Sequence, residues 1–327
     1  MSENYNNNRV SYSSKVQGFT LIELMISLVL GLLISAAVMQ VYVISARTIT
    51  VQQSASEVQD STIFALQAIE DRVRIANLGN PITNINDATS HGGVVLTTTN
   101  LGSNNDTGTE FLTNSNGFRG WAGTSNIRDV ASDQLTIQYK NITPNIMYDC
   151  EGTAVPAGDA NWVIERYFVR LASSASSGTG VQDLVLACAA GRVDNDGEVT
   201  TAFTGNGAVI VAAIDQFKVL LGTQTNVTQL TYLPANIYLG LTDKPAITTI
   251  KLGIIIRSST PLITDADKDT FTILGEAQTL KTDTTRSKYY RRSYESTVLL
   301  RNARVMTVIA TAPKLASTTT PPTSATP

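Results

Sequence analysis

The sequence predicts an α+β protein in which one long N-terminal helix packs against an antiparallel β-sheet. The segment Leu24–Ala46 is apolar and contains no charged residue. The apolar residues that follow it recur at spacings of three and four until about Leu78, as in an amphipathic helix. Segments rich in β-branched and aromatic residues then indicate strands in the second half of the chain. A helix followed by a series of strands is typical of an α+β fold.

The first part of the predicted helix is long enough to cross a membrane. At about 1.5 Å per residue, Leu24–Ala46 would extend for roughly 34 Å, and a hydrocarbon core is about 30 Å thick. Residues 1–18 are polar with a positive balance, so they should stay in the cytoplasm while the bulk of the chain emerges on the far side. A secretory signal cut after Ala46 would need a shorter apolar region, and a plain membrane anchor does not account for Glu23.

Glu23 is the unusual residue because it places an acid at the start of the apolar run. An ionised carboxylate in a bilayer costs a few kcal/mol, so it usually has a partner. If the chain is cut after Gly18, Phe19 becomes a new N-terminus whose positive amine lies on the same helix face as Glu23. In an assembly of parallel helices, the amine of one subunit could neutralise the acid of its neighbour and set the register of docking.

The stretch "GFTLIELMISLVLGLL" (18–33) resembles the leader junction of type IV pilins and of type II secretion pseudopilins. The family pattern is a glycine, an aromatic residue or methionine, and then T-L-I-E-L. The resemblance implies that a prepilin peptidase cuts after Gly18 and methylates the amine of Phe19. It also implies that Glu23 guides the subunit into a helical filament.

The predicted organisation of the chain follows its composition. Glycine and proline after Leu78 are a helix stop signal, and the Pro-, Ser- and Thr-rich end lacks the apolar residues that ordering requires. The expected parts are a leader (1–18), a transmembrane or filament-core helix (19–46), its amphipathic continuation (47–78), a β-rich head (79–310) and a disordered tail (311–327).

Strands are expected within the head at 133–140, 161–171, 182–189, 247–259 and 294–302. The segment 247–259 is interpreted as a central strand. The segment 208–222 is expected to begin helical or irregular and to end as a strand. Residues 80–132 are rich in Gly, Asn, Thr and Ser, which predicts loops with short strands.

The chain contains two cysteines, Cys150 and Cys188. A pair beyond an apolar anchor suggests an oxidising compartment and one disulfide, which could staple the first and third predicted strands. Closing this loop would stabilise the fold by roughly 4 kcal/mol on the chain-entropy argument. Two buried free thiols are the alternative.

One acidic stretch has the spacing of a calcium loop. Asp265, Asp267, Asp269 and Glu276 stand at positions 1, 3, 5 and 12 of an EF-hand pattern, but Thr270 occupies the sixth position, where that loop needs glycine. The flanking residues look like strands rather than helices. A solvated turn between strands is therefore favoured over calcium, and no cofactor is expected.

Catalysis and DNA binding are both disfavoured. The one histidine, His91, lies beside glycines, and no nucleophile motif such as G-x-S-x-G is present, so an enzyme is not expected. Arg286, Lys288, Arg291 and Arg292 cluster with two tyrosines, a combination that suits single-stranded DNA. Alternation along a strand would divide these cations between two faces, so DNA is not expected as a partner.

Two further stretches resemble the PilW family of minor pilins, "VQDSTIFALQAIEDRVRIANLG" (58–79) and "YYRRSYESTVLLRNARV" (289–305). The resemblance implies a subunit that helps prime assembly of the type IV pilus and is incorporated near its tip. The implied partners are other minor pilins (FimU-, PilV-, PilX- and PilE-like), the major pilin and often a PilY-type tip adhesin.

The same resemblance implies where the protein works. It would be a single-pass protein of the inner membrane of a Gram-negative bacterium, with a periplasmic head, before it enters the extracellular pilus. Two alternatives stay open. One is a J-type minor pseudopilin of the type II secretion system, and the other is a pilus-tip module for adhesion or DNA uptake.

Overall fold

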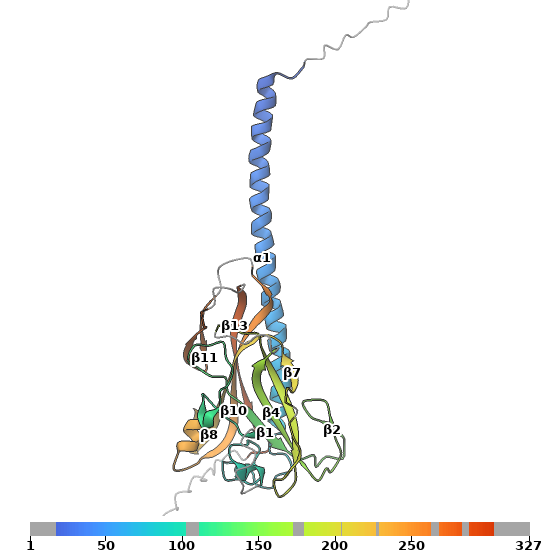
Figure 1. The fold of residues 1–327 in the computed structure, drawn as a ribbon, viewed down its shortest axis with the longest axis vertical. Coiled ribbons are helices and arrows are strands. Elements are labelled where there is room, and N and C mark those ends of the chain that lie inside the picture. The colour runs from blue at the N-terminus through green and yellow to red at the C-terminus, as the bar shows by residue number, and fades with distance from the viewer. Residues whose placement is uncertain are drawn as a thin grey trace, which may run out of the picture. The chain divides into compact units, whose positions relative to one another are not determined.

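The computed structural model describes residues 18–102, 111–172, 180–203, 205–226, 229–262, 268–282 and 288–303. Most of the predicted leader and all of the predicted tail lie outside these ranges. The chain divides into two compact units, Met1–Val51 and Gln52–Pro327, which are described separately. A long helix followed by antiparallel sheets confirms the α+β class (Figure 1).

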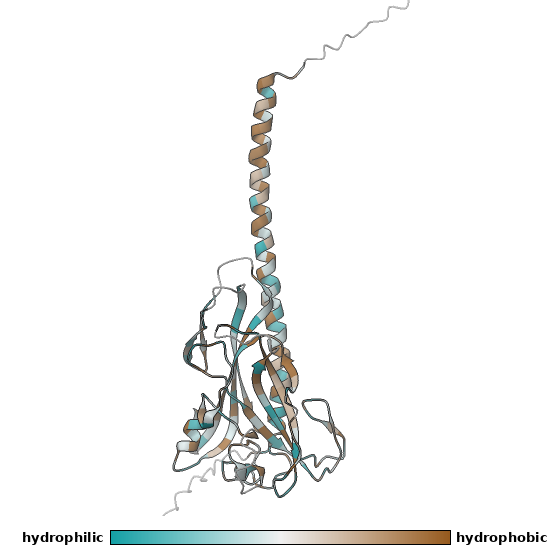
Figure 2. Ribbon diagram, in the orientation of Figure 1, coloured by the Kyte–Doolittle hydropathy of each residue, from teal (hydrophilic) through white to brown (hydrophobic). Residues whose placement is uncertain are grey.

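The helix α1 comprises Leu21–Ile75. In the first unit its side chains from Leu21 to Ser45 are all exposed, and this stretch is strongly hydrophobic (Figure 2). Among the described helices, α1 alone is long and apolar enough to cross a membrane. Such a surface is stable only when lipid or other apolar helices cover it.

Within the second unit, α1 is amphipathic. Val58, Ala65, Ile69 and Val73 are buried, and they recur at the helical spacing that the sequence predicted. They belong to one core cluster with residues of both large sheets, among them Leu186. Burial of this stripe, rather than helix propensity, therefore stabilises the second half of α1.

The helix ends at Ile75, earlier than the predicted Leu78. Asn77 adopts a left-handed conformation with φ 66°, which asparagine tolerates better than most residues. Its backbone N–H donates to the carbonyl of Gln138 at 2.9 Å. The side chain of Asn302 donates to the carbonyls of Ile75 and Ala76 at 3.3 and 3.2 Å. Asn302 thus satisfies carbonyls that the helix end leaves unpaired.

Two antiparallel sheets form the framework of the head. In the first, the order is β1-β4-β5-β6, and β7 also pairs with β5; its strands are β1 (Leu135–Tyr139), β4 (Trp162–Leu171), β5 (Leu184–Val193), β6 (Val199–Thr201) and β7 (Ala208–Val211). In the second, the order is β13-β10-β8-β9; its strands are β8 (Ile214–Asn226), β9 (Gln229–Leu233), β10 (Ala246–Pro261) and β13 (Tyr289–Leu299).

Smaller elements complete the head. They are the hairpins β2–β3 (Met147–Tyr148 and Ala154–Val155) and β11–β12 (Thr270–Ile273 and Glu276–Thr279), the short helix α2 (Ala235–Gly240), and two 3₁₀ turns at Thr98–Leu101 and Phe118–Gly120. Short strands were expected only within 80–132, where the described residues form the two 3₁₀ turns and isolated β-bridges instead. The two hairpins and α2 were not predicted, because elements of this length show little periodicity.

The strand predictions were largely right. The predicted central strand corresponds to β10, which pairs with both β13 and β8. The expectation of a helical or irregular start at 208–222 was wrong, because Val209 lies in β7 and pairs with Ala187 of β5. A short apolar run alone does not show whether a segment is a helix or a buried strand. Here the pairing with β5 makes residues 208–211 a strand.

Candidate assembly site

Reciprocal hydrogen bonds between Thr20 and Glu23 close the start of α1. Glu23 Oε2 accepts from the backbone N–H and from the hydroxyl of Thr20, each at 3.1 Å. In return, Thr20 Oγ1 accepts from the backbone N–H of Glu23 at 3.3 Å. This arrangement is a capping box, which satisfies donors that a helix start otherwise leaves free. The signal T-x-x-E was present in the sequence, but Glu23 was interpreted there only as a partner for another subunit.

The capping box gives the acid a partner within its own chain. Hydrogen bonding lowers the cost of placing a charge among apolar groups, and the first turn of a helix favours a negative charge. The surrounding side chains are apolar and highly exposed, with exposed fractions of 87% for Phe19, 79% for Leu21 and 66% for Ile22. The helix therefore presents a single oriented carboxylate within an apolar surface.

Gly18 is not required by packing within this chain. A Cβ placed on it would meet no atom within 4 Å. A bulky residue at this position is therefore compatible with the fold, and its expected effect is on recognition by a peptidase. Cleavage after Gly18 and methylation of Phe19 stay predictions.

Replacing Thr20 by valine is expected to loosen the first turn of α1, because valine keeps the branched shape but lacks the hydroxyl. Loss of an N-cap costs about 1 kcal/mol, so the amide of Glu23 should exchange its hydrogen about fivefold faster. NMR hydrogen exchange on a peptide of residues 19–46 in detergent micelles measures this rate. Thr20→Ser should exchange like the wild type; equal rates in the valine and serine peptides would contradict the capping role.

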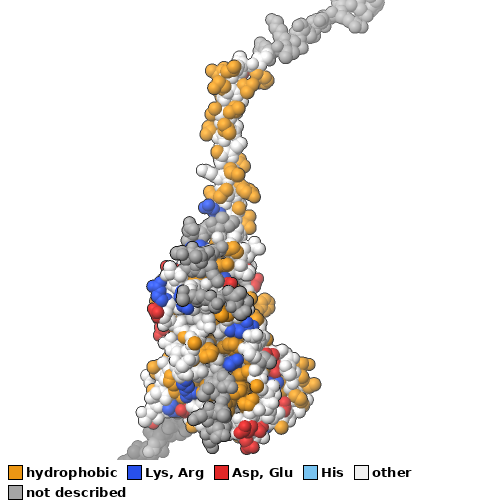
Figure 3. Space-filling view, in the orientation of Figure 1, with side chains coloured by type: hydrophobic (Ala, Val, Ile, Leu, Met, Phe, Trp, Pro, Cys, Tyr) orange, Lys and Arg blue, Asp and Glu red, His pale blue; other side chains and the backbone are white. Residues whose placement is uncertain are grey.

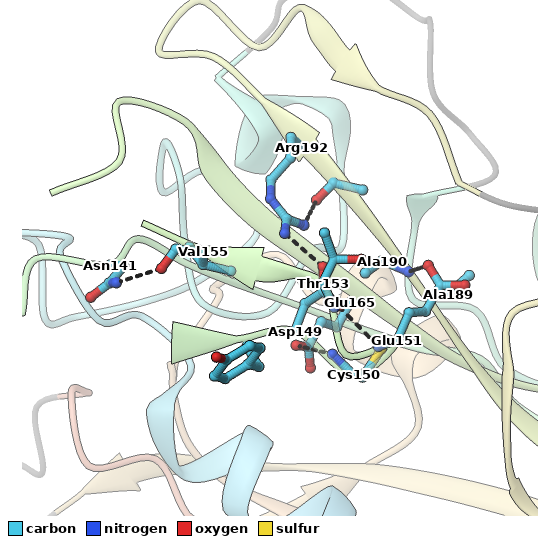
Figure 4. A network of polar contacts seen from close by, with 12 residues as sticks. Asn141, Asp149, Cys150, Glu151, Thr153, Val155, Glu165, Ala189, Ala190 and Arg192 are labelled. Carbon is cyan, nitrogen blue, oxygen red and sulfur yellow. Dashed lines mark hydrogen bonds and ion pairs between the residues drawn. The ribbon is translucent and has the colours of Figure 1, made fainter. Parts of the chain in front are cut away.

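The head contains a fully buried acid, Glu165 in β4, that sequence reasoning missed (Figure 4). Its Oε1 accepts from the hydroxyl of Tyr139 at 2.9 Å and from the backbone N–H of Cys150 at 3.0 Å. Its Oε2 accepts from the hydroxyl of Tyr167 at 2.7 Å. Arg72 of α1 lies 3.8 Å from Oε1. Side chains of α1 and the first sheet thus converge on one carboxylate.

Burial raises the pKa of the Glu165 carboxyl above its ordinary value. Burial also raises the pKa of Tyr139 and of Tyr167, and the nearby Glu165 adds to both shifts. Burial alone would lower the pKa of Arg72, but Glu165 and the tyrosines bring it above its ordinary value. The network therefore titrates as a coupled group.

Glu165→Gln is expected to flatten the pH dependence of head stability. Because the folded pKa of Glu165 is raised, the folded state holds a proton that the unfolded state loses above the ordinary value of 4.5. The free energy of unfolding of the wild type should therefore fall, relative to the glutamine variant, as the pH rises above about 4.5. Urea denaturation of the full chain in detergent, at a series of pH values, measures the difference. A wild type that gains stability relative to the variant over this range would exclude the raised pKa.

The structure joins Cys150 and Cys188 in a disulfide, with Cα atoms 6.2 Å apart. Cys188 lies within β5 rather than at the end of a strand, and Cys150 follows the short β2. Glu165 lies close enough to both sulfurs for the three residues to form a potential metal-binding group. Both sulfurs are already joined to each other, so this arrangement serves as a crosslink between the β2–β3 segment and the first sheet.

The candidate calcium residues are only partly described. Asp265 and Asp267 lie outside the described ranges. Asp269 directly precedes β11, Glu276 is the first residue of β12, and both are exposed. Two residues with positive φ, Leu274 and Gly275, form the turn of this hairpin. The calcium hypothesis therefore stays a prediction.

The basic cluster is divided as strand alternation predicted. Arg291 is buried, and its Nε donates to Asp215 Oδ2 at 2.7 Å. The guanidinium of Arg292 instead lies 4.3 Å from the ring centroid of Tyr290. Arg286 lies outside the described part of the chain, and Lys288 is exposed. At least two of these cations thus have contacts within the head.

The sequence matches two known families. The model of the family Type IV Pilus-assembly protein W (PilW) matches residues 166–302, from within β4 to just beyond β13. The prokaryotic N-terminal methylation motif matches residues 13–39, which include Gly18, Phe19 and Glu23. No curated protein matches the chain significantly.

Among solved structures, the type IV-like pilin TTHA1219 from Thermus thermophilus is similar, with a TM-score of 0.38 and 11% identity. The similarity covers 75% of this chain and 97% of that chain. The likeness to this structure is too low to carry an argument about function. The two family matches, on a chain with a long apolar N-terminal helix and an antiparallel β head, support a type IV pilin-like protein that is similar over residues 166–302 to the PilW family.

Proposed function

We propose that this minor pilin helps prime assembly of the type IV pilus and is incorporated near its tip, in a complex with other minor pilins. The observation that carries the proposal is the oriented carboxylate of Glu23 at the start of an exposed apolar helix, in a chain that matches PilW. No catalytic step is part of this role, because the subunit acts by docking.

The geometry at the start of α1 suggests how docking begins. Thr20 binds one oxygen of the carboxylate, Oε2, which leaves Oε1 to accept from a second donor. Removal of the leader after Gly18 would create that donor as the amine of Phe19, and the amine of a neighbouring subunit would pair with Glu23. A charge pair in apolar surroundings is strong only when both groups align, so it would fix the axial register of the two helices.

The membrane anchor would allow these subunits to prime filament assembly. Subunits held in the inner membrane of a Gram-negative bacterium, with their heads in the periplasm, would form the first turn of the filament before the major pilin adds. The head would select the lateral partners, namely FimU-, PilV-, PilX- and PilE-like minor pilins and a PilY-type adhesin. A preformed first turn removes the nucleation cost for later subunits.

Deleting the gene tests this function against the alternatives. Loss of surface pili and of twitching, with normal secretion of exoproteins and rescue by the wild-type gene, supports the pilus role. Loss of secretion with normal pili would instead indicate a J-type pseudopilin. Normal pili that fail to adhere or to take up DNA would indicate a tip-binding module.

A further inference from the structure

The head presents an uncharged, apolar segment to solvent. Residues 141–148, called the apolar loop below, have the sequence N-I-T-P-N-I-M-Y. The exposed fractions are 60% for Ile142, 60% for Ile146 and 56% for Tyr148. Figure 3 shows hydrophobic side chains at the lower right of the head, over the segment that Figure 1 labels β2. Large exposed side chains that gather in one place mark interaction surfaces more often than isolated ones do.

Buried polar side chains hold the apolar loop in one conformation. Asn141 is fully buried, and its Nδ2 donates to the carbonyls of Asn145, Val155 and Pro156 at 2.9 to 3.0 Å. Its Oδ1 accepts from the backbone N–H of Thr143 at 3.0 Å. One side chain therefore fixes both the start of the loop and the strand that returns beside it.

A second clamp holds the end of the loop (Figure 4). Asp149 is buried, and its Oδ1 accepts from the backbone N–H groups of Glu151 and Thr153 at 3.0 and 2.9 Å. Its Oδ2 accepts from Arg192 of β5 at 2.6 Å. The disulfide at Cys150 lies next in the chain. The loop is thus ordered before any partner arrives.

The apolar loop is also tied to the assembly helix. Arg72 of α1 donates to the carbonyl of Tyr148 at 2.5 Å, and it reaches the buried Glu165 from the same position. This contact joins the end of the loop to the second half of α1.

We propose that the apolar loop is the docking surface for the head of a neighbouring type IV pilin-like subunit, an inference that rests on the proposed function. The pre-ordered loop lowers the entropy cost of binding, and its aliphatic and tyrosine side chains are of the kind that anchor protein interfaces. The partner presents an apolar depression, because the loop offers no charge to pair. A membrane surface is disfavoured, since peripheral membrane segments carry lysine or arginine for anionic headgroups.

Photocrosslinking in cells that assemble pili tests the partner. The photoreactive residue p-benzoyl-phenylalanine at position 146 of the full chain should give an adduct with a pilin-like subunit, identified by mass spectrometry. The same residue at position 237 is the control, because Ile237 in α2 is also 50% exposed but lies on another element. No adduct at position 146, an adduct with phospholipid alone, or equal adducts at both positions would overturn the proposal.

A matched pair of variants tests the surface itself. Ile146→Glu should lower the amount of this protein in purified pili by about tenfold, as loss of an interface anchor does, while Ile237→Glu should not. The melting temperature of the purified chain should stay unchanged in both, which separates docking from folding. If gene deletion abolishes pili but Ile146→Glu is incorporated normally, the docking surface is wrong and the proposed function stands. If deletion leaves pili intact, the proposed function fails, and the crosslink still decides the partner of the loop.

Discussion

Replacing Glu23 by alanine is expected to leave the leader cleaved and to lower incorporation of the protein into pili by at least about tenfold. Gly18 and Phe19 are unchanged in this variant, so a peptidase that reads the junction should still cut. The amine of Phe19 in the neighbouring subunit would then lack its acid. An unpaired buried charge costs roughly 3–5 kcal/mol, and each 1.4 kcal/mol corresponds to about a factor of ten.

Glu23→Gln separates charge from shape. The glutamine oxygen can still accept from Thr20, as Oε2 does at 3.1 Å, so the start of α1 should keep its cap. Incorporation should nevertheless fall as far as in the alanine variant, because the negative charge is lost. Immunoblots of sheared pili and of inner membranes give the ratio of assembled to processed protein. Pili that contain normal amounts of either variant would exclude the pairing between subunits.

Removing the disulfide by Cys150→Ala with Cys188→Ala is expected to lower the free energy of unfolding of the head by roughly 4 kcal/mol on the chain-entropy argument. The two residues are 38 positions apart in the chain. For a head of this size, the loss corresponds to a fall in melting temperature of about 10 °C. Differential scanning calorimetry of the full chain in detergent measures it.

The local effect of the same change should appear near the apolar loop. Cys150 donates its backbone N–H to Glu165, so the crosslink helps to hold the loop end against the first sheet. Proteolysis should therefore cut the double variant first within 141–156. A reductant should produce the same shift in melting temperature in the wild type and none in the variant. If the melting temperature changes by less than about 2 °C both in the double variant and in the reduced wild type, the disulfide adds little to the stability of the head.

The parts of the fold that the sequence predicted are those with long, regular patterns. The stripe through Val58, Ala65 and Ile69 specified the inner face of α1, because apolar residues at this spacing share one face only when the chain is helical. The apolar, β-branched segment that became β10 was recognised as central because it is long and continuous. The end of α1 was placed too late because glycine and proline were the visible signals, whereas Asn77 makes the left-handed turn.

The buried polar network could not have been predicted from the sequence. The strand that contains Glu165 also contains Arg166 and Arg170. From the sequence alone, Glu165 therefore looked like one of several charged side chains that face solvent. Tyr167 lies in the same strand, but Tyr139, Cys150 and Arg72 come from other parts of the chain, and contacts over such sequence distances leave no local pattern. The Thr20–Glu23 cap differs, because its T-x-x-E signal is local and could have been recognised.

The first residue of the native protein is the most direct test of how this subunit docks. N-terminal sequencing and mass spectrometry of the protein from sheared pili should find a chain that starts at Phe19 with a methylated amine. A chain that still starts at Met1, or one cut near Ala46, would contradict the pairing of that amine with Glu23.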